Sequence, residues 1–301
     1  MEWLVALIPK YLVVVTTMLA TSCMLTLFAP NLISQVSDLT SYGKTNANPK
    51  FWLARILAVP KKWFRHFYIF AVLWTSACLY LGWAFTKKQL KSEPYVPYFR
   101  RLTNKSPQIP FSLGMLVMSL VLFHVFRRCM ETLFVSIYSS STMNVGHYLL
   151  GLFHYALLPL SIACETLGFA SKSVYEPSFP VLSTTQAIGI FLFFYANLEQ
   201  NKAARYLRSC RTAADGTVST EGHSICYGGW FDLVSCPHFL FEILIYVSLL
   251  LVLSSGVSAF KYVAAFVAIN QVFAAQITHR WYKTHFKEYP AHRTAIIPYL
   301  L

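Results

Sequence analysis

The chain has 301 residues, of which 56% are hydrophobic and only 12% are charged. Soluble domains carry about 25% charged residues, so this composition argues against a soluble globular protein and indicates an integral membrane protein. The net charge of +13 would suit nucleic-acid binding, but the basic residues stand at the ends of apolar runs, where they normally meet lipid headgroups. We therefore expect membrane lipids as partners and no nucleic acid.

Seven stretches of the sequence are apolar enough to be membrane spans. A spanning helix needs about 20 mostly apolar residues, and the first stretch is too long for the core of a cleaved signal peptide, so we expect it to be retained. In chain order the predicted spans cover residues 11–33, 67–85, 111–126, 145–163, 181–198, 239–255 and 258–277. The sequence therefore predicts an all-α integral membrane protein with about seven transmembrane helices.

Basic residues indicate how these spans are oriented. The loop after the fifth span and the C-terminal tail are both rich in Lys and Arg. With seven spans they lie on the same side of the membrane, which the positive-inside rule makes cytosolic. The loop 87–108 is also strongly basic and falls on the opposite side, so the order of the early spans stays open.

One carboxylate lies inside a predicted span. Glu242 follows His238 by four residues and precedes Tyr246 by four, so all three share one stripe of a helix. Ionisable groups inside a bilayer are costly unless they have partners, which makes Glu242 a candidate functional residue. A purely structural His–Glu pair near a helix end is the alternative that the spacing leaves open.

Further polar residues stand at the ends of the third and fifth spans. Asn197 and Asn201 share a stripe, and Arg208 follows them in a basic loop. Arg208 could bind phosphate, because Arg makes bidentate charge-assisted hydrogen bonds to phosphate oxygens; simple positive-inside charge is the alternative. Arg127 and Glu131 are four residues apart and predict an ordinary helix-end ion pair.

Several kinds of site have no sequence signal. No acidic residue or cysteine stands at ligand spacing around His147 and His154, so we expect no metal. The seven cysteines form no CxxC pair, and we expect them to pack as small hydrophobic residues rather than as a disulfide framework. GxGxxG, P-loop, HExxH and GxSxG motifs are absent. A nucleotide would have to be held by membrane helices and their loops.

Three segments in the C-terminal third carry a family resemblance. "NLEQNKAARYLRSCR" (197–211), "YGGWFDLVSCPHFLFEILIYVS" (227–248) and "HRWYKTHFKEYPAHRTAIIPYLL" (279–301) resemble, in this order, the C-terminal signature of the steroid 5-alpha-reductase family. "VPKKWFRHFY" (59–68) and "FRRCMETLFVSIYS" (126–139) look most like its polyprenol reductase branch.

The resemblance implies a fold and a cofactor. Members of this family are multi-pass enzymes of the endoplasmic reticulum membrane, whose seven helices enclose a cavity for substrate and NADPH. It implies a substrate-side region over residues 1–110 and a reductase domain with the NADPH site over residues 111–301. Carried over by position, the cofactor contacts would be Asn197, Asn201, Arg208, His238, Glu242, Tyr246, Arg280 and Tyr282.

The resemblance also implies roles for the tail and for catalytic residues. The aromatic, basic tail would fold back as one wall of the NADPH pocket, and His279 is expected to be essential; a juxtamembrane anchor is the alternative. The chemistry needs a donor to the substrate oxygen. His66 and Tyr68 are the candidates, and the polar stretch "SIYSSSTMN" (136–144) is a second source.

The expected substrate follows from two positions at which this sequence departs from the steroid-acting members of the family. Steroid-acting members place a Glu and a Tyr against the substrate carbonyl, but the matching positions here look like Ala58 and Val125. The resemblance thus implies a long-chain polyprenyl substrate, reduced at its α-terminal double bond to the dolichol-type lipid used in protein N-glycosylation. The alternatives are a 3-oxo-steroid or enoyl-thioester reductase, a prenylcysteine methyltransferase that would bind S-adenosylmethionine, and a non-catalytic seven-span receptor or channel.

Overall fold

The computed structural model describes residues 57–86, 109–166, 180–213, 215–220, 222–254 and 259–301. The first predicted span (11–33) and the basic loop (87–108) lie outside them. The longer helices of the described chain are α4 (Phe64–Thr86), α6 (Phe111–Met130), α7 (Val145–Ala163), α8 (Thr184–Ser209), α9 (Pro237–Leu253) and α10 (Ala259–His285). Each overlaps one of the six later predicted spans, so those helices are confirmed.

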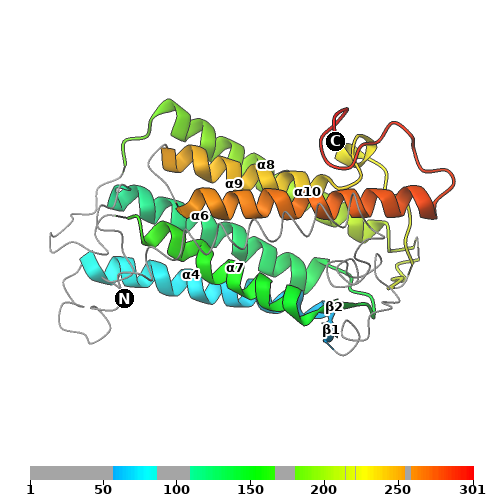
Figure 1. Cartoon of the computed structure of the whole chain (residues 1–301), viewed down its shortest axis with the longest axis horizontal. Helices are drawn as coiled ribbons and strands as arrows, with labels where there is room; N and C mark the ends of the chain where they lie inside the picture. The colour runs from blue at the N-terminus through cyan, green and yellow to red at the C-terminus, as the bar shows by residue number, and fades with distance from the viewer. Residues whose placement is uncertain (1–56, 87–108, 167–179, 214, 221, 255–258) are drawn as a thin grey trace, which may run out of the picture.

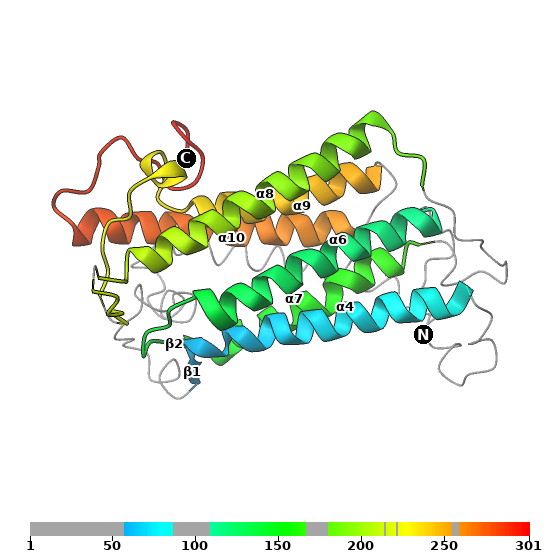
Figure 2. The ribbon, with the colours of Figure 1, turned by 180° about the vertical axis from the view of Figure 1, so that it is seen from behind.

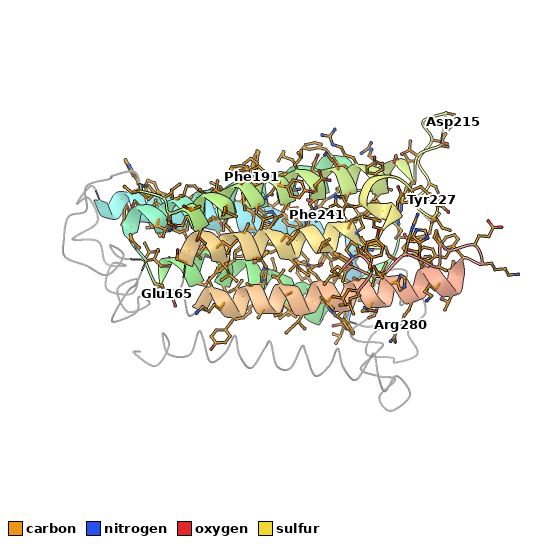
Figure 3. The ribbon with its side chains drawn as sticks, turned by 90° about the horizontal axis from the view of Figure 1, so that it is seen from above. Glu165, Phe191, Asp215, Tyr227, Phe241 and Arg280 are labelled. Carbon is orange, nitrogen blue, oxygen red and sulfur yellow. A yellow bond between two sulfur atoms is a disulfide. The ribbon has the colours of Figure 1, made fainter. Side chains whose placement is uncertain are left out.

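The helices lie side by side in one elongated bundle. α8, α9 and α10 form one layer, and α4, α6 and α7 form the other, in both views (Figures 1 and 2). Phe241 of α9 is fully buried, with its ring against Tyr195 of α8 and Trp230 (Figure 3). Gly189 lets α8 approach α9 closely, because a Cβ there would lie 2.9 Å from the backbone oxygen of Ser248. A side chain at this position would force the two helices apart.

Four stretches of the described chain are long and apolar enough to cross a membrane. They are Lys61–Ala84, Phe111–Val135, Val145–Ala163 and Ala259–His285. α9 is apolar but has only 17 residues, and the second half of α8 carries charged side chains. The described chain is therefore a mostly helical membrane protein with four candidate spans.

Local sequence explains where several helices begin. Ser183 and Gln186 form a capping box, in which each side chain accepts a hydrogen bond from the other residue's backbone N–H. Asn144 caps α7 by accepting from the N–H of Gly146 at 2.7 Å. Pro237 stands in the first turn of α9, where a missing N–H is tolerated.

Short elements close one end of the bundle (Figure 2). β1 (Ala58–Pro60) pairs antiparallel with β2 (Thr142–Asn144), and the 3₁₀ turn η2 (Lys61–Trp63) leads from β1 into α4. A π-helical turn, η3 (Glu131–Val135), continues α6, and a 3₁₀ turn, η4 (Gly229–Asp232), precedes α9. The sheet therefore ties the start of α4 to the start of α7.

The C-terminal segment turns back after α10 and lies beside η4 (Figure 1). The backbone N–H groups of Ser235 and Cys236 donate to the carbonyls of Thr294 and Ala295, at 2.9 and 3.1 Å. Ala295 and Ile296 are buried in the same small apolar cluster as Cys236. The tail is thus a folded part of the protein.

One expectation about the cysteines is wrong. Cys210, at the end of α8, forms a disulfide with Cys226, and their Cα atoms are 5.7 Å apart. The two residues are 16 positions apart, so the pair does not have the CxxC spacing that a sequence search would detect. The turn of the chain after α8 brings them together. The other described cysteines, Cys78, Cys129, Cys164 and Cys236, form no disulfide and are buried as expected.

Candidate active site

A cavity of about 400 Å³ lies between the helices. Its walls come from the first turns of α4, the segment that follows α6, the first half of α7, the second half of α8, the start of α9 and the middle of α10. These segments lie toward the end of the bundle that carries β1 and β2 (Figure 2).

A buried carboxylate at the end of α6 organises two guanidinium groups. Glu131 is 2% exposed and receives hydrogen bonds from Arg127 and Arg128, at i,i+4 and i,i+3 spacing. The amide of Asn201 on α8 donates to the same carboxylate at 2.7 Å. The predicted Arg127–Glu131 pair is confirmed, and it belongs to a larger network that joins α6 to α8.

Glu242 is the second buried carboxylate, and it lies on the cavity wall. Nε2 of Gln200 on α8 donates to its Oε2 at 2.5 Å. Nε2 of His124 on α6 lies 3.4 Å from its Oε1. The carboxylate of Glu242 therefore has polar neighbours from two other helices, which a buried ionisable group in a membrane protein needs.

Asn197 links the two carboxylate clusters. Its Oδ1 accepts from Nε of Arg127 at 2.9 Å and lies 3.1 Å from Nδ1 of His124. Arg127 also donates to the side-chain oxygen of Gln200. One polar network therefore joins α6, α8 and α9 inside the apolar bundle. Removing a single member would leave a buried partner unsatisfied, which is far more costly than a surface change.

Tyr68 on α4 presents a hydroxyl at the cavity. Its oxygen accepts hydrogen bonds from Nε and Nη2 of Arg128, at 3.3 and 3.2 Å, and the guanidinium carbon lies 5.1 Å from the ring centre. Because Arg has only donors, the hydroxyl hydrogen of Tyr68 is not used in this contact. It can be donated to an oxygen of a bound molecule.

His154 and Tyr246 lie deeper in the bundle. Nε2 of His154 is 3.0 Å from the hydroxyl of Tyr246, and the His154 ring stacks on Phe266. His154 and His147 line the cavity, whereas Tyr246 does not. No group of three or more potential metal ligands occurs among the residues that the structure describes.

Cations lie at the end of the cavity nearest the sheet. Arg208 donates to the carbonyls of Phe134 and Val135, at 2.6 and 3.1 Å, and Arg211 donates to that of Ile137 at 2.9 Å. Both arginines line the cavity. Their guanidinium groups are anchored by backbone carbonyls, so they are held in place for an anionic ligand.

The stretch after η3 contributes a phenol. Tyr138 lines the cavity, and the Arg65 guanidinium lies 5.2 Å from its ring centre. Burial raises the pKa of Tyr138, so the phenol stays protonated at neutral pH and can donate a hydrogen bond. The second predicted source of donors therefore reaches the cavity.

A third cluster holds the C-terminal segment. The hydroxyl of Ser235 lies 2.6 Å from Nδ1 of His279 and 2.5 Å from the hydroxyl of Tyr289, whose ring stacks on Tyr282. Burial raises the pKa of Tyr289, which therefore remains a donor. The segment is also fastened at Arg293, which donates to the carbonyl of Cys226 at 2.9 Å.

This cluster leads to a stability prediction. Ser235→Ala removes the hydroxyl that joins His279 to Tyr289, so two part-buried polar groups lose a partner. We expect a loss of about 1–3 kcal/mol, measured as a lower melting temperature in detergent. Thr284→Ala, at an exposed position of the same helix as His279 that only bonds back to its own turn, should change little; equal effects of the two would contradict the role of Ser235.

The structure brings together some of the sequence-predicted site residues. Tyr68, Arg208, His238 and Glu242 line the cavity, and Asn197, Asn201 and Tyr246 lie in or beside the networks just described. The others lie outside the cavity lining. His66 is exposed, and its Nδ1 lies 3.1 Å from the Tyr148 hydroxyl. The cavity lining also does not include His279, Arg280 or Tyr282. Arg280 is exposed on α10 (Figure 3).

Sequence reasoning missed several polar residues of the site. Gln200, His124, Arg128 and Gln271 were not assigned roles, although each is polar within or beside an apolar run. Gln200 follows Asn197 by three residues and so shares its helix face. This spacing was the signal that could have found it.

Comparison with known proteins identifies the family. The chain is 42% identical to the polyprenal reductase of Caenorhabditis elegans over 98% of this chain and 96% of that protein. The chain belongs to the steroid 5-alpha-reductase family, in its polyprenal reductase branch. The family model described as 3-oxo-5-alpha-steroid 4-dehydrogenase matches residues 167–301. As a member of this family, the protein is an oxidoreductase that acts on a carbon–carbon double bond.

Vertebrate members of the polyprenal reductase branch are more distant. Identity is 34% to the protein of Danio rerio, over 90% of each chain. It is 31% to the protein of Homo sapiens, over 87% of this chain and 85% of that one. The resemblance inferred from the sequence segments is thus confirmed, including the branch.

Proposed function

We propose that this chain is an NADPH-dependent reductase of the α-terminal double bond of polyprenal, which gives the dolichol-type lipid used for protein N-glycosylation. The 42% identity to a polyprenal reductase over nearly the whole chain supports this most directly. The cavity adds a chemical reason, because it combines anchored cations, a buried carboxylate and phenol donors with apolar walls.

The cavity residues suit NADPH. When bound, NADPH supplies the hydride for the β carbon of the substrate. Arg208 and Arg211 hold its phosphates at the sheet end, since guanidinium groups pair with phosphate oxygens. His238 and Glu242, which stand on α9, bind uncharged hydroxyl or amide groups of NADPH. Asn197, Asn201 and Tyr246 act behind the cavity wall, where they contact Arg127, Glu131 and His154, respectively.

The tail residues have a different role in this proposal. His279 and Tyr282 hold the C-terminal segment through Ser235 and Tyr289. Arg280 is exposed at the end of α10, where a guanidinium suits lipid headgroups. These residues support the sheet end of the bundle without lining the cavity.

Tyr68 is the proposed donor to the aldehyde oxygen. Negative charge develops on this oxygen when hydride reaches the β carbon, and a fixed O–H donor stabilises it. Arg128 holds the Tyr68 hydroxyl and adds positive charge beside it. A proton then adds to the α carbon. His66 is less suited, because it is exposed and outside the cavity lining.

We further propose a seven-span arrangement in the endoplasmic reticulum membrane with the C-terminus cytosolic. The four candidate spans are then joined by α8, α9 and the apolar run 11–33. Residues 1–110 form the substrate side, and residues 111–301 form the NADPH domain. Supporting this orientation, Arg205, Arg208 and Arg211 stand together at the end of α8.

A steroid substrate is the second candidate, since the matching family model is described as a 3-oxo-5-alpha-steroid 4-dehydrogenase. Two positions argue against it. Ala58 pairs with Asn144 in the small sheet, and Val125 is fully buried in α6. Neither lines the cavity, and neither side chain can donate to a ketone.

The test is turnover by purified protein. Detergent-purified chain is given NADPH and either polyprenal, polyprenol, a 3-oxo-steroid or a trans-2-enoyl thioester, and products are identified by mass spectrometry. We expect polyprenal to gain one hydride and one proton, and the others to react at least about ten times more slowly. Polyprenol lacks the carbonyl that activates the double bond, and the steroid and the thioester lack the prenyl chain that the proposed site binds in the transition state. Faster steroid turnover would contradict the proposal.

A further inference from the structure

Gln271 on α10 carries a buried hydrogen-bond acceptor at the cavity. Its side chain lines the cavity, yet its Oε1 is shielded from solvent and accepts no hydrogen bond from the described part of the chain. Buried polar atoms nearly always have a partner. Leaving one unpaired destabilises a protein by about 1–3 kcal/mol. This oxygen is therefore placed for a donor that a ligand brings.

The surrounding wall limits what this ligand group can be. On α10, Val267 and Asn270 line the cavity one turn and one residue before Gln271, and Phe239 of α9 lines it as well. The arginines anchored at the cavity, Arg208 and Arg211, come from the end of α8. The α10 side chains that line the cavity beside Gln271 are thus uncharged, which suits a ligand portion that is uncharged and carries an N–H or O–H donor.

The two molecules of the proposed reaction differ in this respect. The aldehyde end of polyprenal has an acceptor oxygen and no donor, so it cannot satisfy Oε1 of Gln271. The nicotinamide ring is flat and apolar apart from a primary carboxamide, which offers both an NH₂ and a carbonyl. An amide side chain can pair with such a group through two hydrogen bonds, one in each direction.

We propose that Gln271 binds the carboxamide of the nicotinamide: Oε1 accepts from its NH₂, and the Gln271 NH₂ donates to its carbonyl. The assignment rests on NADPH being the cofactor, as proposed above. Two opposed hydrogen bonds fix the direction of the carboxamide and so the face of the ring that is turned to the substrate. Gln271 is then a cofactor-binding residue that selects one orientation of the hydride donor.

Binding of a cofactor analogue tests this directly. In the reduced 3-acetylpyridine analogue of NADPH, a methyl group replaces the carboxamide NH₂. Dissociation constants for NADPH and for the analogue are measured without substrate on wild type, Gln271→Met and the control Gln276→Met. Gln276 is on the same helix and does not line the cavity. Met keeps the length of the side chain and removes its hydrogen bonds.

We expect wild type and Gln276→Met to bind NADPH about tenfold more tightly than the analogue, the value of one buried hydrogen bond. Gln271→Met should bind both equally. If Gln271→Met keeps the tenfold preference, the assignment is overturned, even if both ligands bind more weakly. If wild type binds neither ligand, NADPH itself is the wrong cofactor. Gln271→Leu replaces Gln271→Met should the latter not fold.

Discussion

Replacement of Glu242 by Gln is expected to abolish NADPH binding and to destabilise the bundle. The carboxylate accepts from the Gln200 amide and faces His124. A Gln at this position places an NH₂ against one of these donors and removes the charge that His124 faces. Breaking a buried pair in this way costs about 3–5 kcal/mol of folding free energy. Loss of the proposed charged hydrogen bond to NADPH, about 3 kcal/mol, separately weakens binding about a hundredfold.

The measurement is a titration of NADPH into detergent-purified wild type and variant, with melting temperatures recorded in parallel. Glu199→Gln is the matched control, because Glu199 is on the neighbouring helix α8, lies outside the cavity lining and, among the described residues, pairs with exposed Lys202. It should leave both quantities nearly unchanged. An unaltered NADPH dissociation constant in folded Glu242→Gln would remove Glu242 from the NADPH site and leave it a purely structural role.

Tyr68→Phe is expected to lower kcat by about 10²–10³, because loss of one fixed donor to a developing oxyanion has effects of this size. NADPH binding should change less than threefold, since the ring remains and only the hydroxyl is lost. The experiment is steady-state turnover of polyprenal beside a binding titration. This split between turnover and binding distinguishes a donor from a residue that merely supports the fold.

Tyr138→Phe is the internal control for this result, because Tyr138 lines the same cavity with a protonated phenol. If Tyr138→Phe abolishes turnover and Tyr68→Phe does not, the donor lies after η3 and not on α4. Loss of activity in both variants with intact binding would indicate that the two phenols act together. Full activity in both variants would contradict the proposal that a phenol donates to the substrate oxygen.

Helical periodicity and apolar runs predicted the six described helices well, because long apolar stretches have few alternatives in a membrane. The predicted range 145–163 coincides with α7 (Val145–Ala163). The polar half of α8 is different. Composition ended the predicted apolar span at residue 198, but the helix continues to Ser209. It can do so because Arg127, Glu131 and Phe134, on α6 and η3, provide hydrogen-bond partners for its polar side chains.

The site was predictable only to a limited extent, for a related reason. Spacing along one helix pointed to Glu242 and Asn197, which share faces with other polar residues. It could not supply His124 as the neighbour of Glu242, nor Arg128 as that of Tyr68, because those pairs form between helices distant in sequence. The pairing of Cys210 with Cys226, only 16 positions apart, was missed for another reason, because it depends on the turn of the chain after α8. The tail was correctly expected to fold, but its partner Ser235 lies before α9 and not on the cavity wall.

The network that joins α6, α8 and α9 has a consequence for the amount of protein in a cell. Two members of this network, Gln200 and Glu242, both hold the helices together and line the proposed cofactor site, so ligand occupancy and resistance to degradation are thermodynamically linked. Substitutions in this network should therefore lower steady-state abundance as well as catalysis, and a small shift in stability can change abundance several-fold. A genetic assay that reads only lipid output would merge the two effects. Measuring the protein level together with the amount of lipid product, while the cofactor supply is varied, would separate the effect on abundance from the effect on catalysis.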